Sequence, residues 1–287
     1  MIKGWLIYSE LDSIENKAYI EWFITEAKKQ LIDLQLVLRE KLTIGVMNNK
    51  HYCLLEGQQV ELPNFAVVRT VESILNRQLE HLGIQVFNSS HLSEVANHKA
   101  KTYFEVAKLG IPMMDTIFVK SHNLTDHTPM PYPFVIKEAT GRGGRQVFFI
   151  RNQKEWESFY HDVKPSDYVI QSTEVKLGKD LRVFVVGKEI IAAVLRESNT
   201  DFRANYKLGG SATLYSLSRE EKALIDKIIH HFNFGMVGID FLIGHNGELI
   251  FNEIEDIVGS RTLSAVSDIN LLEKYVGYIR TSKNQDS

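Results

Sequence analysis

The sequence predicts a mixed α/β fold, with an open α/β unit in the first third and a region where strands predominate after it. Three observations predict this class. Strand-like apolar runs alternate with amphipathic helical stretches as far as Gly110. After Pro133, strand-like runs follow one another with few helices between them. Further on, two apolar runs flank Asn246-Gly247, the strongest short hairpin signal because both residues tolerate positive φ.

Composition narrows the class of protein. The chain has 287 residues, of which 44% are hydrophobic and 24% charged, enough for about two domains. No apolar run has the length of a membrane span and no secretory signal is visible, so we expect a cytoplasmic protein with no membrane partner. The single cysteine, Cys53, excludes an internal disulfide framework and a Cys-based zinc cluster. A net charge of −3 predicts no nucleic-acid partner, and a homo-oligomer is compatible with the sequence.

In the first third, alternating elements predict a parallel sheet. The expected strands cover residues 4–9, 34–39 and 84–87, and the expected helices cover residues 18–30 and 71–82. Residues 41–60 form an expected hairpin excursion that turns at Asn48-Asn49. Another helix is expected over residues 97–109, ended by Gly110 and Pro112. The stretch 121–133, rich in His, Thr and Pro, is the expected linker.

Beyond this linker the pattern favours strands. They are expected over residues 134–137, 146–151, 168–171, 181–186 and 190–196. Helices are expected over residues 154–161 and 269–279. A third helix begins after Ser218, which forms a capping box with Glu221.

The hairpin around Asn246-Gly247 carries a candidate metal site. A two-residue turn there places Asp240 directly opposite Glu253, and the alternation of side chains puts Glu255 on the same face. Carboxylates crowded on one sheet face repel each other unless a cation holds them, and Mg²⁺ prefers oxygen ligands shared with substrate phosphates. The same register places Leu242 and Phe251 on the acidic face and four isoleucines on the other: Ile239, Ile243, Ile250 and Ile254.

Two alternatives stay open for this hairpin. The acids can form a solvated face that merely keeps an antiparallel pair soluble. A longer loop that includes His245 would shift the pairing by one residue, although Glu253 and Glu255 would still share a face.

Three further segments combine glycine, cations and acids. Residues 141–145 read Gly-Arg-Gly-Gly-Arg directly after an apolar strand ending in Lys137; such a loop can approach phosphates, or can be a flexible turn beside a lysine that snorkels to solvent. Asp180 and Arg182 share one face of a strand. They can belong to a phosphate site, or they can be an exposed pair that contributes little to stability. The loop over residues 200–211 holds Arg203, which can stabilise a transferring phosphoryl group or lie in solvent.

The order of these segments resembles the ATP-grasp fold, specifically the RimK-like carboxylate–amine ligases. The resemblance covers roughly residues 84–279, and its most specific matches are Asp180-Leu181-Arg182 before Val185-Val186-Gly187 and Asp201-Phe202-Arg203-Ala204-Asn205 before Gly209-Gly210. It implies an amino-terminal α/β domain over residues 1–94, a central lid subdomain over 95–172 and a carboxyl-terminal, antiparallel-sheet ATP-binding subdomain over 173–287.

The resemblance also implies roles for single residues. Asp240, Glu253 and Glu255 would hold two Mg²⁺ ions, with Mn²⁺ as a possible substitute. Arg203 would act in catalysis as well as in binding, and Arg261 would receive an acceptor carboxylate, unless Arg261 is a surface arginine beside a helix. The residues implied for ATP binding are Lys99, Lys137, Gly141, Gly143, Gly144, Gln171, Ser172, Asp180, Arg203 and Asn205.

Three departures from the family pattern concern the site. The family commonly has Asn where this chain has Glu255, and an acid where it has Ser172. Residues 256–261 replace a Ser-Pro-Gly-like turn that borders the substrate pocket. The amino-terminal third, with Tyr19, Trp22 and Arg69, carries no recognisable motif, yet it would form part of the cleft.

The activity that the resemblance implies is ATP-dependent ligation through an acyl phosphate. The partners would be a small-molecule or peptide carboxylate and an amine such as an amino acid. One alternative is ligation of small amino acids or dipeptides, and the other is a nucleotide-binding regulatory module that has lost catalysis.

Overall fold

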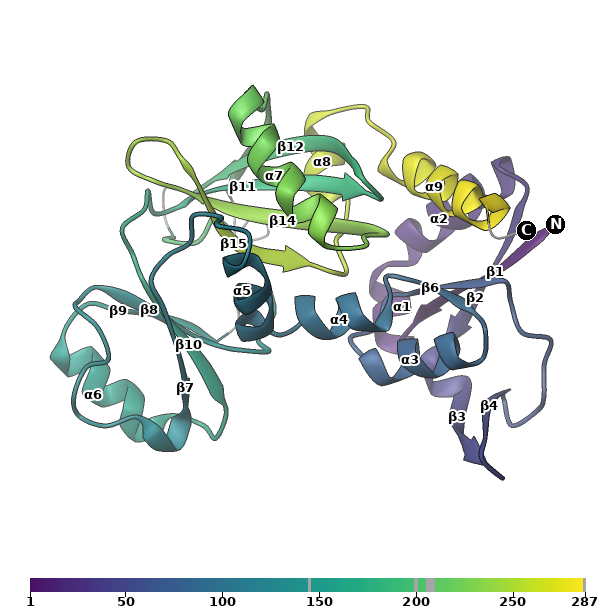
Figure 1. Ribbon diagram of the computed structural model, residues 1–287, viewed down its shortest axis with the longest axis horizontal. Coiled ribbons are helices and arrows are strands. Elements are labelled where there is room, and N and C mark those ends of the chain that lie inside the picture. The colour runs from purple at the N-terminus through teal and green to yellow at the C-terminus, as the bar shows by residue number, and fades with distance from the viewer. Residues whose placement is uncertain (144–145, 199–200, 205–209, 286–287) are drawn as a thin grey trace.

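The computed structural model describes residues 1–143, 146–198, 201–204 and 210–285. Its strands form three larger sheets and one small hairpin sheet (Figure 1). Among the described residues, no helix has the length and apolar character needed to cross a membrane.

The amino-terminal sheet is parallel, as the alternating pattern predicts, and has the order β2-β1-β5-β6. Its strands are β1 (Ile2–Tyr8), β2 (Ile32–Leu38), β5 (Phe65–Val68) and β6 (Gln85–Phe87). Helix α2 (Lys17–Lys29) packs on one face through Phe23, and α3 (Ser73–His81) packs on the other through Leu75. The expected hairpin is present as β3 (Leu42–Met47) and β4 (Lys50–Leu55). A short helix that the sequence did not predict, α1 (Glu10–Glu15), follows β1.

Two short helices lead from this sheet into the lid sheet, where we predicted one. The helix expected over residues 97–109 is α5 (Lys99–Ala107), and α4 (Ser90–Ala96), capped by Ser89, precedes it. The lid sheet has the order β7-β10-β8-β9. Its elements are β7 (Thr116–Lys120), β8 (Phe134–Glu138), β9 (Val147–Ile150), β10 (Asp167–Ser172) and helix α6 (Gln153–Asp162).

The expected linker over residues 121–133 is wrong, because this segment lies inside the lid. It joins β7 to β8 and begins with a single 3-10 turn, η2 (Ser121–Asn123). The indole of Trp156 donates a hydrogen bond to the carbonyl of Thr125 at 3.0 Å. Met130 and Tyr132 also pack against the lid core. The strand β7, which the sequence pattern did not reveal, pairs with β10 and explains why the segment stays with the lid.

The carboxyl-terminal sheet is antiparallel, with the order β13-β12-β11-β14-β15. Its strands are β11 (Lys179–Val186), β12 (Glu189–Glu197), β13 (Ser211–Tyr215), β14 (Met236–Ile243) and β15 (Leu249–Glu255). Helix α7 (Arg219–His231) covers one face and begins with the predicted capping box of Ser218 and Glu221. On the other face, Phe184 and Val186 share a core with the amino-terminal sheet. The remaining helices are α8 (Arg261–Val266) and α9 (Leu271–Gln285), and α9 returns to pack beside α2 (Figure 1).

The β14–β15 hairpin has a longer loop than a two-residue turn. Ile243 pairs with Leu249, so five residues form the loop, and a bulge at Asn252 then shifts the register back. Asp240 therefore lies opposite Glu253, as predicted, although by a different route. Because of the bulge, two side chains lie on the sheet face opposite to the predicted one. Phe251 points into the core with Ile239, and Ile250 lies on the other face beside Leu242.

One buried asparagine joins the amino-terminal part to the carboxyl-terminal sheet. Asn88 is 5% exposed, and its side-chain nitrogen donates to the carbonyls of Met236 and Asp256 and to the Asp256 carboxylate. Its side-chain oxygen accepts from the backbone nitrogens of Gly235 and Met236. Because each buried polar atom is satisfied, this contact holds the two sheets in a fixed relation. The predicted division into three parts, at residues 94 and 172, remains a proposal. Helix α9 belongs to the third part in sequence but packs against α2 of the first part.

Candidate active site

The centre of the site is Asp240, which is 1% exposed on β14. Arg182 of β11 donates two hydrogen bonds to its carboxylate, at 2.8 and 2.7 Å, and Arg196 of β12 donates one at 2.9 Å. Burial alone would raise the pKa of Asp240, but the two guanidinium groups lower it to about 2. Its negative charge is therefore stable at every physiological pH.

The charges continue in a line across four strands. Arg196 also binds Asp180 through two hydrogen bonds, at 2.6 and 2.7 Å, and Arg182 also forms an ion pair with Glu255. Burial raises the pKa of Asp180 to about 6 against the opposing effect of Arg196, and burial also raises the pKa of Glu255. The alternative of an exposed Asp180–Arg182 pair is wrong, because each residue pairs with a different strand inside the protein.

The three predicted metal ligands lie on neighbouring positions of β14 and β15. Asp240 is opposite Glu253, while Glu255 pairs in register with Gly238. Glu253 is half-buried and accepts no hydrogen bond from any described residue, whereas Asp240 and Glu255 are held by Arg182. In this arrangement no three His, Cys, Asp or Glu side chains of the described residues come together as a metal centre. Metal ligation by these acids stays a prediction.

The two predicted lysines lie beside these acids. Lys137, at 8% exposure, has its Nζ 3.2 Å from the Oδ1 of Asn252 and 5.9 Å from the centre of the Tyr103 ring. Burial lowers the pKa of Lys137 to about 8; nearby Glu253 opposes this shift and Lys99 adds to it. Lys99 is the first residue of α5, and its Nζ donates to the carbonyl of Gly141. Lys137 is thus a buried cation, not a lysine that snorkels to solvent.

The glycine-rich turn joins β8 to β9 above the same acids. Gly143 has a φ of +63°, a conformation that glycine adopts without strain. Gly144 lies outside the described residues. The turn and the acids line one narrow pocket, whose charged and glycine residues are Lys99, Gly141, Arg142, Gly143, Glu253, Glu255 and Asp256.

Asn252 is a site residue that the sequence reasoning missed. It occupies the bulge of β15, so its side chain turns toward Lys137 instead of following the strand alternation. Its carbonyl accepts a hydrogen bond of 2.6 Å from the hydroxyl of Tyr103. The only sequence signal was an amide directly before the two glutamates.

Gln171 and Ser172, which the resemblance implies for ATP binding, end strand β10 of the lid sheet. Gln171 is buried and donates to the hydroxyl of Thr116 at 2.9 Å, while the backbone nitrogen of Ser172 donates to the carbonyl of Asp115. A small apolar cluster combines Val175, which follows β10, and Met114, which precedes β7, with Leu242 and Ile250 of the β14–β15 hairpin.

The two predicted catalytic arginines lie outside this charge line. Arg203 is half-buried and binds Asp201 of the same loop through two hydrogen bonds, at 2.9 and 2.7 Å. Its neighbour Phe202 packs on Phe149 of the lid sheet, with 5.2 Å between ring centres. Asn205 lies outside the described residues. Arg261 is exposed at the first position of α8.

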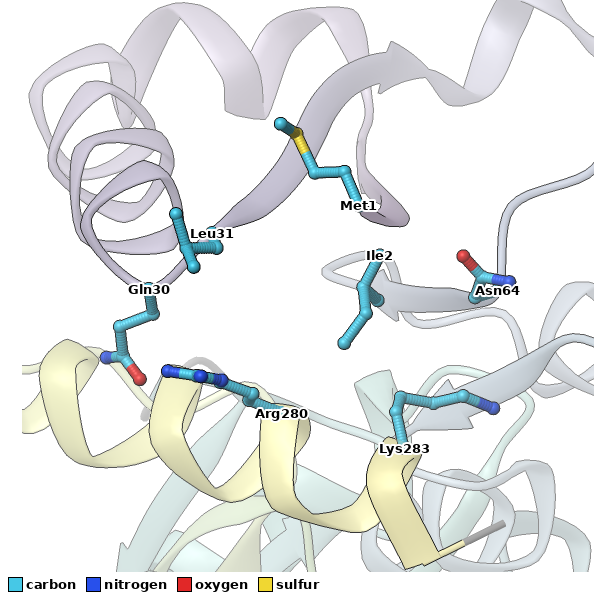
Figure 2. A pocket seen from close by; sticks show the side chains of 7 residues that line it. All are labelled: Met1, Ile2, Gln30, Leu31, Asn64, Arg280 and Lys283. Carbon is cyan, nitrogen blue, oxygen red and sulfur yellow. The ribbon is translucent and has the colours of Figure 1, made fainter. Parts of the chain in front are cut away.

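A second hollow, of about 410 Å³, lies at the amino-terminal end of strand β1. Figure 2 shows that it is bordered by the start of β1, the end of α2 and helix α9, with Arg280 projecting from α9. None of the predicted site residues lines it.

Comparison with known proteins gives consistent matches. The family model of the RimK-like ATP-grasp domain matches residues 96–279. A probable alpha-L-glutamate ligase of Legionella pneumophila (strain Corby) is 29% identical over 210 residues, which are 71% of this chain and 69% of that protein. N-acetylaspartylglutamate synthase A of Mus musculus is 32% identical over 250 residues, covering 80% of this chain and 65% of that protein.

Solved structures agree on the fold. A RimK domain ATP-grasp protein from Sphaerobacter thermophilus DSM 20745 superposes with a TM-score of 0.73 at 15% identity, covering 97% of this chain and 99% of that one. D-alanine–D-alanine ligase from Bacillus anthracis, complexed with ATP, has a TM-score of 0.72 at 14% identity and covers 100% and 98%. The ATP-grasp ligase PsnB, complexed with a precursor variant, Mg and ADP, has a TM-score of 0.72 at 12% identity and covers 98% of both chains. These matches confirm the predicted fold.

Proposed function

Because the chain belongs to the RimK-like ATP-grasp family and is an ATP-dependent ligase that forms C–N bonds, we propose that it joins a carboxylate of a small molecule or peptide to the amine of an amino acid. The observation that carries this proposal is the pocket in which the glycine-rich turn, Lys99 and the acids of β15 meet beside buried Lys137. A nucleoside triphosphate with its metal ion requires backbone amides and cations at the phosphates and carboxylates at the metal.

In the proposed complex, the ATP phosphates lie between the glycine-rich turn and the two lysines. Lys99 and Lys137 neutralise phosphate oxygens, and the backbone amides of Gly141 and Gly143 approach them closely. The base enters the apolar cluster that contains Met114 and Ile250, where Gln171 and Ser172 border it. The pKa of Lys137, near 8, leaves it charged at neutral pH, which suits contact with an anion.

Asp240, Glu253 and Glu255 are the proposed ligands of two Mg²⁺ ions. The donor set fits the metal because all three are carboxylates, and Glu253 accepts no hydrogen bond from a described residue. Bound Mg²⁺ supplies charge neutralisation at the phosphates. Arg182 shares Asp240 and Glu255 with the metal, so its guanidinium is the group that must yield when metal binds.

The proposed reaction has two steps. A carboxylate oxygen of the first substrate attacks the γ-phosphorus of ATP, ADP leaves, and an acyl phosphate forms. The amine nitrogen of the second substrate then attacks the acyl carbon, phosphate leaves, and the nitrogen loses a proton. Arg203 stabilises the transferring phosphoryl group, and the protein contributes mainly positioning and charge.

L-Glutamate is the first amine to test, because relatives of this chain are glutamate ligases. Ligation of small amino acids or dipeptides is the second candidate, favoured by the structural match to D-alanine–D-alanine ligase.

The test incubates the purified protein with ATP, Mg²⁺ and a panel of acids paired with L-glutamate and other amino acids. We expect ADP release that requires both an acid and an amine, together with a product whose mass equals the two substrates minus water. Removal of Mg²⁺ with EDTA abolishes release. Binding of ATP without ADP release across the whole panel would contradict the proposal.

A matched pair of variants tests the metal site. Glu253→Gln removes a carboxylate that accepts no hydrogen bond from a described residue, so we expect ADP release to fall at least about 100-fold with an unchanged melting temperature. Glu248→Gln, in the exposed loop of the same hairpin, should leave both unchanged. Equal activity of the two variants would exclude Glu253 as a metal ligand.

A further inference from the structure

An arginine without a carboxylate partner lies where the amino-terminal sheet faces the rest of the molecule. Arg69 directly follows β5, and its backbone nitrogen donates to the carbonyl of Ile7 in the neighbouring parallel strand at 2.8 Å. Tyr8 ends that strand. In open α/β sheets, ligands bind beyond the carboxyl ends of the strands, which is the position of both residues.

Among the described residues, Arg69 has no acidic partner, and the groups that favour its charge are tyrosine hydroxyls. Five described arginines are not exposed: Arg39, Arg69, Arg182, Arg196 and Arg203. All except Arg69 form an ion pair with an aspartate or glutamate. The Arg69 side chain donates a hydrogen bond of 3.0 Å from Nη2 to the carbonyl of Val258, and the Tyr8 hydroxyl lies close enough to the guanidinium to raise its pKa. A half-buried cation of this kind is normally paired with an acidic side chain or bound to an anionic ligand.

The groups around Arg69 also lack partners. The guanidinium carbon lies 5.6 Å from the ring centre of Tyr19 and 6.0 Å from that of Tyr8. The hydroxyls of Tyr8, Tyr19 and Thr70 and the Nε of Arg69 are fully buried, and none has a hydrogen-bond partner among the described residues. Tyr8 as a whole is 2% exposed. Leaving such donors unpaired costs about 1–3 kcal/mol each, so their concentration around one cation indicates a binding site.

The contact with Val258 connects this group to the reaction site. Val258 is fully buried and lies three residues after Glu255, in the segment between β15 and α8. Arg69 therefore touches the chain segment that leaves the acids of the proposed metal site.

We propose that Arg69, with the hydroxyls of Tyr8 and Tyr19, binds a carboxylate of the amino-acid substrate that is not consumed in the reaction. This inference rests on the proposed ligase function and names the group that positions its amine substrate. A guanidinium binds a carboxylate through charge-assisted hydrogen bonds, and the tyrosine hydroxyls add neutral donors.

The test measures binding of L-glutamate by calorimetry in the presence of ADP and Mg²⁺. Arg69→Gln should weaken binding about 10- to 100-fold, and Arg69→Lys less, because lysine keeps the charge but loses the fork geometry. Tyr8→Phe should weaken it by a smaller factor. Arg39→Gln is the matched control: Arg39 directly follows neighbouring β2, but Glu72 already pairs with it at 2.6 and 2.7 Å, so glutamate binding stays unchanged.

A second readout separates binding from a purely structural role. L-Glutamine and L-isoglutamine each replace one carboxylate of glutamate with an amide. The wild-type protein should discriminate against one of them, and Arg69→Gln should lose that discrimination while its affinity for ADP and its melting temperature stay the same. In the full reaction, KM for the amine rises and KM for ATP does not.

The outcomes are distinguishable. Glutamate binding that is equal in wild type and Arg69→Gln, or absent from both, overturns the role of Arg69. ADP release with an acid–amine pair would still support the ligase proposal in that case. Conversely, absence of ADP release across the panel contradicts the ligase proposal even where Arg69 binds glutamate.

Discussion

At the scale of single residues, burial decides what each charge can do. Lys137 keeps a charge inside the protein although its pKa lies near 8, and the amide of Asn252 is its one described hydrogen-bond acceptor. Such a group opposes folding and is retained at a binding site because an anionic ligand compensates it.

Replacement of Lys137 by Met should therefore raise stability and abolish activity. Below pH 8 the lysine is charged in both the folded and the unfolded protein, so the full burial cost is present; between about pH 8 and 10.5 the folded form loses its proton and the cost disappears. We expect Lys137→Met to gain about 1–3 kcal/mol at pH 7, shrinking toward pH 10.5, since one pKa unit corresponds to about 1.4 kcal/mol. ADP release should fall at least about 100-fold.

Urea denaturation at pH 7 and pH 10 measures this difference. Lys120→Met is the control, because Lys120 is exposed and pairs with Asp167 on the surface of the same sheet. A loss of stability in Lys137→Met at pH 7 would show that the lysine stabilises the fold.

At the scale of elements, close contacts decide which turns tolerate a side chain. The turn between β11 and β12 contains Gly187, with a φ of +57°. A Cβ there would lie 2.5 Å from a ring carbon of Tyr278 on α9. This turn is thus packed against the carboxyl-terminal helix and cannot move away without disturbing it.

Substitution of this glycine by alanine should be markedly destabilising. Gly57 provides the comparison, since its φ is +77° but an added Cβ would meet no atom within 4 Å. We expect Gly57→Ala to cost about 1 kcal/mol from backbone strain alone, and Gly187→Ala about 2–4 kcal/mol because the clash adds to it. Denaturant midpoints compare the two, and equal values would show that Tyr278 yields freely.

At the scale of the whole molecule, one core joins the amino-terminal and carboxyl-terminal sheets. It includes Phe23 of α2, Phe184 of β11 and Leu272 of α9, all fully buried. A substitution that destabilises α9 should therefore destabilise both of these sheets. The lid sheet has its own core around Trp156.

Leu272→Ala tests this coupling. Removal of the buried side chain should cost about 2–5 kcal/mol. Hydrogen exchange should accelerate in both β1 and β11 but not in β8. Leu214→Ala, on the edge strand β13 with 54% exposure, should change stability by less than about 0.5 kcal/mol. Acceleration confined to β1 would mean that the two sheets unfold independently.

The sequence by itself determined the fold class, the parallel amino-terminal sheet and the capping box of α7. These follow from periodicity and local turn chemistry, which act between near neighbours. The register at Asp240 was predicted from a turn that is not present, and the bulge at Asn252 restores it.

Only the tertiary structure decided which charges meet. The line from Asp180 through Arg196, Asp240 and Arg182 to Glu255 crosses four strands, and no local pattern encodes such contacts. The buried position of Arg69 without an acidic partner likewise becomes visible only when the strand ends and Val258 come together. Burial and electrostatic pairing depend on the packed molecule, because a charge in a linear sequence is surrounded by water until distant segments enclose it.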